Sequence, residues 1–312
     1  MLSAPLPTAV LCIGHAAYDL TVFVQRFPKE NSKSETDELL ECGGGPAANA
    51  AYLLSSWGIK CAFGGLIGDD AYGHRILSEF ASQGTDVSLV EIRPGHLTPF
   101  STILVNRFNG SRTLINRKAS AGTLRLRARA MATMSPRVLL FDGHELGASL
   151  QALHRFPGAL SILDAGSLRE GTRRLADKVS YLVASENFAL QFFGLHALDS
   201  HRARRNTIAG LRARYGNTVV ITLGERGLIA LNSEGYAELP AFQTKAVDTT
   251  GAGDVFHGAF AYGLVTGLSF GQTLALASMA ASLSVQRKGG RTSIPTLAEV
   301  RLALRKTSPG TE

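Results

Sequence analysis

Residues 247–260 combine a carboxylate with a glycine-rich turn and the start of a long apolar run. Gly251 and Gly253 allow the backbone to turn sharply and to approach a ligand closely. The apolar residues from Ala252 onward predict a buried helix, whose first N–H groups and positive dipole end suit a phosphate. Asp254 then falls in the first turn, where it can take a proton from a hydroxyl that attacks the phosphate. An ordinary turn, with an aspartate that pairs with the helix dipole, is the alternative.

A second glycine-rich segment, residues 43–45, precedes Pro46 and a run of alanine and leucine. Proline in a first turn, followed by such a run, predicts a helix. Asn49 is a poor residue for a helix interior, so its amide is expected to serve a ligand or to bond a neighbouring loop. Asp19 follows a predicted strand at residues 9–13, where it can face a ligand at the carboxyl edge of a parallel sheet or simply occupy a turn.

The rest of the chain supplies the elements that would hold these residues. Short apolar runs alternate with helical segments from about residue 120, which is typical of a parallel sheet with helices on both faces. The expected strands are residues 138–141, 160–163, 181–184 and 219–223. Residues 98–117 alternate in polarity around Asn109-Gly110, which predicts a hairpin. Together with residues 21–41 they are expected to form a small separate sheet.

The composition favours a globular protein that binds anionic small molecules. The chain has 312 residues, of which 45% are hydrophobic, and a net charge of +7. This length is enough for a large core, and the charge favours anionic ligands. The basic residues are scattered rather than interleaved with aromatic residues, so no nucleic-acid partner is expected. The sequence has no Walker, dinucleotide-binding, metal-ligand or G-x-S-x-G pattern.

Three further features bear on location. Residues 1–7 lack the basic and apolar regions of a signal peptide. The apolar run at residues 257–285 is interrupted by polar residues and glycine, which predicts two buried helices rather than a membrane span. The three cysteines, an odd number in a large chain, are expected to be reduced thiols. Together these features predict a cytoplasmic protein with no membrane partner.

Two motifs resemble those of the ribokinase-like (PfkB-type) carbohydrate kinases. The first is Gly44-Gly45-Pro46-Ala47-Ala48-Asn49, and the second, more specific one is Asp248-Thr249-Thr250-Gly251-Ala252-Gly253-Asp254. The resemblance spans about residues 9–304. It implies one Rossmann-like α/β domain over residues 1–312, with a parallel-rich central sheet, helices on both faces and a β-sheet lid at about residues 21–41 and 98–117. It also implies transfer of the ATP γ-phosphoryl group to a sugar hydroxyl with Mg²⁺, and homodimerisation through the lid, as in several members.

The resemblance further implies roles for individual residues. Asp254 matches the catalytic base, and the anion hole matches Gly251, Ala252 and Gly253. The sugar-binding positions match Asp19, Gly44, Gly45 and Asn49. The nucleotide loop matches Thr222, Gly224 and Gly227. A monovalent-cation site, where K⁺ would bind, matches Asp248, Thr250, Arg287, Gly289 and Ser293.

One run departs from the family pattern. The family has an N-x-x-E motif after the strand at residues 181–184, linked to Mg²⁺ and phosphate. Here Ser185 stands in place of the asparagine, next to the expected nucleotide, and Phe188 stands in place of the glutamate. Glu186 is the candidate substitute as a Mg²⁺ ligand, directly or through water.

The acceptor is less well defined. Several segments, including residues 289–291, are similar to those of sulfofructose kinases, and Lys33 and Asn116 are candidates to reach an anionic acceptor from the lid. However, no arginine directly follows the strand at residues 138–141 to clamp a sulfonate. The sequence therefore favours a neutral ketose or other furanose-type sugar, phosphorylated on a primary hydroxyl.

Two alternatives remain. A nucleoside kinase of the same family would need an aromatic stacking platform in the lid, for which the candidates are Phe23, Phe100 and Phe108. A non-catalytic sugar or nucleotide sensor is favoured only by the altered run at residues 185–188, whereas the intact Asp254 disfavours it.

Overall fold

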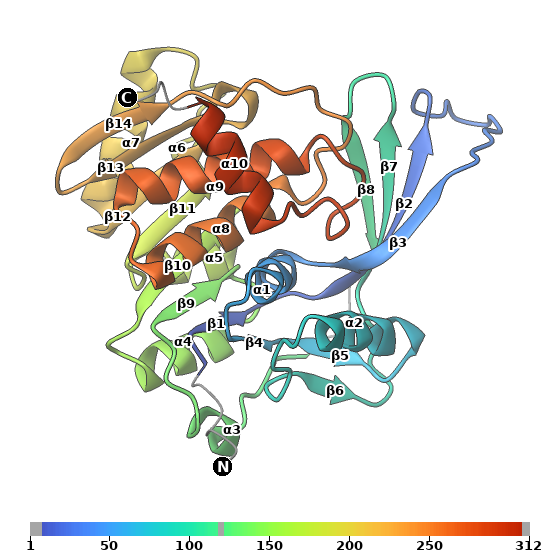
Figure 1. Ribbon diagram of the computed structural model, residues 1–312, viewed down its shortest axis with the longest axis horizontal. Coiled ribbons are helices and arrows are strands. Elements are labelled where there is room, and N and C mark those ends of the chain that lie inside the picture. Colours follow the sequence, from blue (N-terminus) through green and yellow to red (C-terminus); the bar gives the residue numbers. More distant parts are fainter. Residues whose placement is uncertain (1–7, 118–121, 308–312) are drawn as a thin grey trace.

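The computed structural model describes residues 8–117 and 122–307, and its main feature is an eight-stranded β-sheet (Figure 1). The strand order is β14-β13-β12-β11-β10-β9-β1-β4. The strands are β1 (Val10–Ile13), β4 (Cys61–Gly64), β9 (Val138–Phe141), β10 (Leu160–Ala165), β11 (Tyr181–Ser185), β12 (Thr218–Thr222), β13 (Leu228–Asn232) and β14 (Gly235–Leu239). All pairings from β4 to β12 are parallel, and the hairpin β13–β14 adds an antiparallel edge.

Helices cover both faces of this sheet (Figure 1). One face carries α1 (Pro46–Ser56), α8 (Ala252–Thr266), α9 (Phe270–Ser284) and α10 (Leu297–Thr307), with α2 (Ala71–Ser82) beside them. The other face carries α4 (Leu146–Arg155), α5 (Glu170–Leu175), α6 (Glu186–Phe193) and α7 (His201–Tyr215), with the short α3 (Ala128–Met131) at its border.

The core lies on both sides of the sheet because successive strand side chains point to opposite faces. In β1, Val10 and Cys12 pack in the core beneath α1 and α8, whereas Leu11 and Ile13 pack in the core beneath α4. All four residues of β1 are fully buried, as expected for a parallel strand covered on both faces. The predicted α/β fold with a parallel-rich sheet is therefore confirmed.

The predicted small separate sheet is also present, and we call it the lid. Its strand order is β3-β2-β7-β8, and it projects from one side of the main body (Figure 1). The strands are β2 (Ala17–Val24), β3 (Leu39–Gly44), β7 (Phe100–Asn106) and β8 (Arg112–Arg117). The lid strands extend beyond the predicted limits, so Asp19 and Gly44 lie on β2 and β3. The alternative interpretation of Asp19 as a turn residue was therefore wrong.

A two-stranded sheet of β5 (Leu66–Gly68) and β6 (Glu91–Arg93) escaped prediction, because three-residue strands are too short to show an alternating pattern. The three cysteines are buried and free. No helix in residues 8–117 and 122–307 is long and apolar enough to span a membrane. The segment considered for a signal peptide, residues 1–7, lies outside the described residues.

Candidate active site

The N-terminus of α8 presents backbone N–H groups at the predicted anion hole. Gly251 caps the helix with a φ of 75°, a left-handed conformation that side chains other than glycine rarely adopt. The N–H groups of Gly253 and Asp254 lie in the first turn and have no acceptor within the helix. A Cβ built on Gly253 would meet no atom within 4 Å, so the backbone faces open space there. A phosphate could approach both N–H groups from this side.

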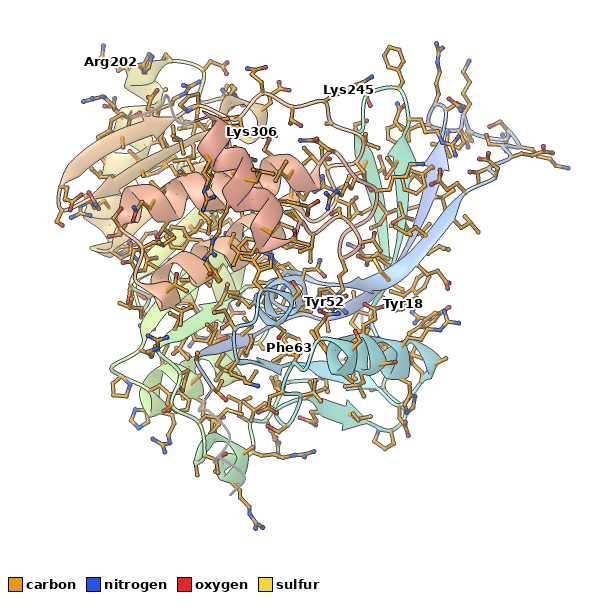
Figure 2. All side chains as sticks on the ribbon, in the orientation of Figure 1. Tyr18, Tyr52, Phe63, Arg202, Lys245 and Lys306 are labelled. Atoms are coloured by element: carbon orange, nitrogen blue, oxygen red, sulfur yellow. The ribbon has the colours of Figure 1, made fainter. Side chains whose placement is uncertain are left out.

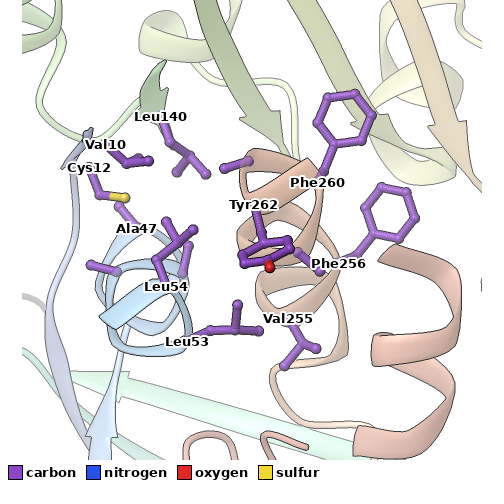
Figure 3. Packing of buried hydrophobic residues seen from close by; sticks show 14 of the residues in the cluster. Val10, Cys12, Ala47, Leu53, Leu54, Leu140, Val255, Phe256, Phe260 and Tyr262 are labelled. Atoms are coloured by element: carbon purple, nitrogen blue, oxygen red, sulfur yellow. The ribbon is translucent and has the colours of Figure 1, made fainter. Parts of the chain in front are cut away.

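Close packing of α1 against α8 brings the two sequence motifs together. A Cβ on Gly258 would lie 3.1 Å from Cα of Ala50, so glycine lets the two helix backbones approach. Apolar side chains of both helices, such as Leu54 and Val255, fill the space around this crossing (Figure 3). As a result, Nδ2 of Asn49 donates a hydrogen bond to Oδ2 of Asp254 over 2.7 Å.

The surroundings of Asp254 suit a base. Burial raises its pKa to about 7, and the nearby negative charge of Asp164 adds to the rise. The hydrogen bond from Asn49 and the positive fields of His257 and Arg112 oppose it. A carboxyl group with such a pKa can accept and release a proton near neutral pH.

His257 is a buried residue of the apolar helix α8. Its ring is nevertheless held by polar atoms. Nδ1 lies 2.6 Å from the Gly253 carbonyl oxygen and 3.2 Å from Oδ2 of Asp164, and Nε2 lies 3.2 Å from the Val183 carbonyl oxygen. This side chain therefore ties the first turn of α8 to the ends of β10 and β11.

The lid contributes a row of polar side chains. Asp19 of β2 is paired with Ser101 of β7, which is paired with Asn116 of β8, so the three share one face of the lid. Burial raises the pKa of Asp19 to about 6, although a hydrogen bond from Ser101 and the positive charge of Arg291 act to lower it. A Cβ on Gly44 would lie 2.0 Å from Oδ2 of Asp19, which explains this glycine. Ser101 escaped the sequence reasoning because only strand register places it beside Asp19.

Other residues that were predicted to line the sugar site do not belong to this row of the lid. Gly45 has a φ of 97° and immediately precedes α1, as the sharp turn requires. Lys33 lies in the exposed loop between β2 and β3, beyond the far end of β2, and is not brought to the row of Asp19 (Figure 1). Phe23, a candidate stacking platform, is 2% exposed inside the lid, while Phe108 is 83% exposed at its tip.

The tip of the lid contacts the loop before α8. Nη1 of Arg112 donates to Oγ1 of Thr249 over 2.7 Å, and the Thr249 hydroxyl lies 3.3 Å from the Gly110 carbonyl oxygen. Arg112 is thereby close enough to lower the pKa of Asp254. Arg112 escaped prediction, although its place two residues after Gly110 of the Asn109-Gly110 turn puts it near the tip of the hairpin.

The predicted nucleotide residues lie at the ends of adjacent strands. Ser185 of β11 is paired with Thr222 of β12. Gly224 and Gly227 follow in the next turn with φ values of 61° and 90°. A Cβ on Gly227 would lie 2.1 Å from the Leu239 carbonyl oxygen, so its small size serves the approach of β14. The loop can still present its backbone to a nucleotide.

The altered family motif has a structural role. Ser185 caps α6 by accepting from the Phe188 N–H over 3.1 Å, and Phe188 itself is fully buried in the core. Glu186 forms an ion pair with Arg226 and accepts from the Leu198 N–H over 3.3 Å. In residues 8–117 and 122–307, no three His, Cys, Asp or Glu side chains lie together as a metal site. The carboxylate of Glu186, the predicted Mg²⁺ ligand, is engaged by Arg226 in this structure.

Asp248 contacts two of the other predicted cation-site residues, Thr250 and Gly289. Its carboxylate accepts from the N–H groups of Thr250 and Gly289, each over 2.8 Å. Ser293 is buried, and its hydroxyl donates to the Gly290 carbonyl oxygen. The Thr250 hydroxyl is buried and has no hydrogen-bond partner among the described residues, as expected of an oxygen reserved for a cation. The Arg287 side chain instead pairs with Glu299 near the surface.

Comparison with known proteins agrees with this geometry. A family model described as pfkB family carbohydrate kinase matches residues 7–297. A ribokinase from Lactococcus lactis subsp. lactis is 26% identical, over 96% of this chain and 98% of that protein. A nucleoside kinase from Methanothermobacter thermautotrophicus is 25% identical, over 93% of each chain.

A solved structure is similar over almost the whole chain. The Arabidopsis thaliana ribokinase complexed with ribose and ATP has 25% sequence identity and a TM-score of 0.81. The match covers 97% of this chain and 100% of that one. The likeness therefore includes both the main sheet and the lid.

Proposed function

The chain belongs to the pfkB family of carbohydrate kinases, and from this membership we propose that it transfers the γ-phosphoryl group of ATP to a primary hydroxyl of a ketose or other furanose-type sugar. As a member, it is a phosphotransferase with an alcohol group as acceptor. The observation that carries the proposal is the position of Asp254, beside the free N–H groups of α8, within 2.7 Å of Asn49 and with a pKa raised to about 7.

The two substrates would approach Asp254 from opposite sides. The sugar lies under the lid against Asp19 and Asn49, with Asn116 in the same row. ATP lies across Thr222, Gly224 and Gly227, with its phosphates at Gly251–Gly253 and Ser185 nearby. The Arabidopsis ribokinase, complexed with ribose and ATP, supports this pair of substrates.

In the proposed mechanism the Asp254 carboxylate accepts the proton of the attacking hydroxyl while the backbone N–H groups of Gly253 and Asp254 stabilise the charge of the transferring group. Asn49 and Asp19 orient the sugar, so that the hydroxyl is held against the base. Bound Mg²⁺ would neutralise phosphate charge, with Glu186 as a candidate ligand after release from Arg226. K⁺ would bind near Asp248, Thr250, Gly289 and Ser293, outside the proton transfer.

Other acceptors fit the observations less well. A nucleoside kinase is supported by a relative of that name, but burial of Phe23 removes one of the three stacking candidates. A sulfo-sugar would need a cationic clamp, and Lys33 lies away from the row of Asp19. The proposal of a neutral sugar therefore stands first.

The test is a measurement of ATP consumption with a panel of ketoses, aldoses, sulfo-sugars and nucleosides. We expect turnover with a neutral furanose-type sugar and loss of nearly all turnover in Asp254→Asn, with ATP binding retained in calorimetry. Retained turnover in this variant would exclude Asp254 as the base. ATP binding without turnover on any acceptor would favour the sensor.

A further inference from the structure

Arg291 is a buried cation that is linked to the proposed base through Asn49, and the reaction as described does not use it. The residue is 4% exposed and lies in the loop between α9 and α10. Its Cζ atom lies 4.7 Å from the Phe80 ring centre and 5.3 Å from the ring centre of Tyr52. Figure 2 shows Tyr52 on α1, near the junction of this helix with the lid. A charge at such a place is costly unless it is paired and hydrogen-bonded.

Its hydrogen bonds join the lid side of the site to Asp254. Nη1 donates to Oε2 of Glu79 over 2.8 Å, and the Glu79 carboxylate also accepts from the Gly43 N–H. Nε donates to Oδ1 of Asn49 over 3.1 Å. The opposite end of the same amide, Nδ2, donates to Asp254. The chain of contacts therefore runs Glu79–Arg291–Asn49–Asp254.

The direction of this chain follows from the chemistry of arginine. A guanidinium can only donate hydrogen bonds, so the Asn49 atom that faces it must be the carbonyl oxygen. The amide nitrogen must then face Asp254. Without Arg291, the Asn49 amide could rotate by 180° and turn its oxygen toward Asp254, an arrangement that a carboxylate disfavours.

Gly43 has its explanation in the same arrangement. A Cβ at this position would lie 2.1 Å from Nη1 and 2.4 Å from Cζ of Arg291, so only glycine leaves room for the guanidinium. No sugar-binding role was predicted for Gly43, in contrast to Gly44 and Gly45. It lies on β3, which pairs with the Asp19 strand β2, so the guanidinium is wedged between the lid and α1.

We propose that Arg291 is a positioning residue for phosphoryl transfer, which holds Oδ1 of Asn49 and thereby turns the Asn49 amide nitrogen toward Asp254. The proposal rests on the proposed function of Asp254 as the base. Glu79 fixes the guanidinium from the other side, and Gly43 makes the space for it.

The test is the pH dependence of kcat in Arg291→Met, which keeps the length of the side chain but cannot donate. A hydrogen bond from Asn49 favours the charged form of Asp254, so its loss raises the pKa of the base. The base must be ionised to act. We therefore expect the acid limb of kcat to move up by about 1 pH unit, with a roughly tenfold loss near pH 6 and a small loss near pH 9.

Other charged groups near Asp254 and Asp19 also influence the pH dependence of kcat, so the experiment needs controls. Asp254 is also faced by Asp164 of β10, His257 of α8 and Arg112 of β8, and the charge of Arg291 acts on Asp19. Arg291→Lys keeps the positive charge but not the fork geometry of the guanidinium. We therefore expect Arg291→Lys to show most of the upward shift of the acid limb that Arg291→Met shows. In an Asn49→Ala background the Arg291→Met change should add no further shift. A shift that acts through Asp19 would persist there and would overturn the proposal.

Two further variants separate positioning from a loss of folding. Gly43→Ala displaces the guanidinium without removing it, and we expect the same direction of shift even if Arg291→Met does not fold. Arg305→Met makes the same chemical change at an exposed position of α10 and should leave the profile unchanged. An equal loss of kcat at all pH values in Gly43→Ala or Arg291→Met contradicts the proposal, whereas an active Asp254→Asn contradicts the proposed function itself.

Discussion

The raised pKa of Asp254 has a thermodynamic consequence at the residue scale. Ordinary carboxyl groups in water lose their proton near pH 4, but the folded protein holds the proton of Asp254 to about pH 7. Between these values the unfolded chain is ionised at this position while the folded chain is not. Ionising Asp254 next to Asp164 therefore costs stability, which the protein gives up for a base that works near neutral pH.

Asp254→Asn should accordingly stabilise the fold in a pH-dependent way. Below about pH 4 the carboxyl group is protonated in both states, so the variant and the parent should unfold alike. As pH rises toward 7 and above, the parent alone pays for ionisation, and the variant should gain stability up to a ceiling of about 4 kcal/mol. Urea unfolding at pH 4 and pH 8 measures the difference. An equal effect at both values would show that the environment of Asp254 does not raise its pKa.

At the scale of elements, the site depends on the close crossing of α1 and α8. The two helices meet at Gly258 and Ala50, and only this approach brings Asn49 within 2.7 Å of Asp254. Alanine is the better residue for a helix interior, so replacing a glycine that close packing does not require would stabilise the protein.

Gly258→Ala should therefore destabilise the protein, by about 1–2 kcal/mol, because the added methyl group meets the Ala50 backbone. We also expect a lower kcat, since the Asn49–Asp254 contact would lengthen. Gly271→Ala is the matched control, because its Cβ would meet nothing within 4 Å in α9, and it should be neutral or stabilising. Urea unfolding compares the two. A stabilised Gly258→Ala would show that the helices tolerate a wider spacing.

The lid is the second element on which the site depends, and Arg112 anchors its tip. Arg112→Met removes the hydrogen bond to Thr249 and a positive charge near the transferring group. We expect kcat/KM for the sugar to fall by about tenfold to a hundredfold, as for loss of a charged hydrogen bond. Arg107→Met is the control, because Arg107 is also a lid residue but pairs with Asp37 and Glu38 at the surface. Equal losses in both variants would contradict a specific role for Arg112.

At the scale of the whole molecule, the two faces of the lid differ in exposure. The face of Asp19, Ser101 and Asn116 also carries the buried apolar side chains of Phe23, Ile103 and Val105, and strand register places a second, more exposed set of apolar residues on the other face. They are Leu20, Val22, Leu39, Leu104 and Ile115. Leu39 and Ile115 are 61% and 62% exposed in the single chain. A homodimer through the lid, as the family resemblance implies, would cover this face.

Ile115→Asp should therefore yield a monomer, because a charge cannot be buried unpaired in an apolar interface. Analytical ultracentrifugation should give about twice the chain mass for the parent protein and the single-chain mass for the variant. Leu302→Asp makes a similar change at an exposed position on α10 and should leave the assembly unchanged. A monomeric parent protein would contradict the proposed dimer directly.

The sequence by itself determined the features that depend on neighbours along the chain. The apolar runs predicted the parallel strands, and the Asn109-Gly110 turn predicted the β7–β8 hairpin of the lid. The glycines before residues 46 and 252 predicted helix N-termini, and the run from 247 to 260 predicted both the anion hole and the position of the candidate base. The predictions of strands, hairpin and helix N-termini are confirmed because periodicity, capping and turn geometry are local, whereas the anion hole and the base stay predictions.

Only the tertiary structure decided which side chains meet. Register across the lid placed Ser101 and Asn116 beside Asp19, and the helix crossing at Gly258 placed Asn49 on Asp254. Burial next to Asp164 set the pKa of the base. Arg291, near the end of the chain, reaches Asn49 across 242 residues of sequence. Distances and desolvation of this kind arise from packing between remote segments, which no local pattern records.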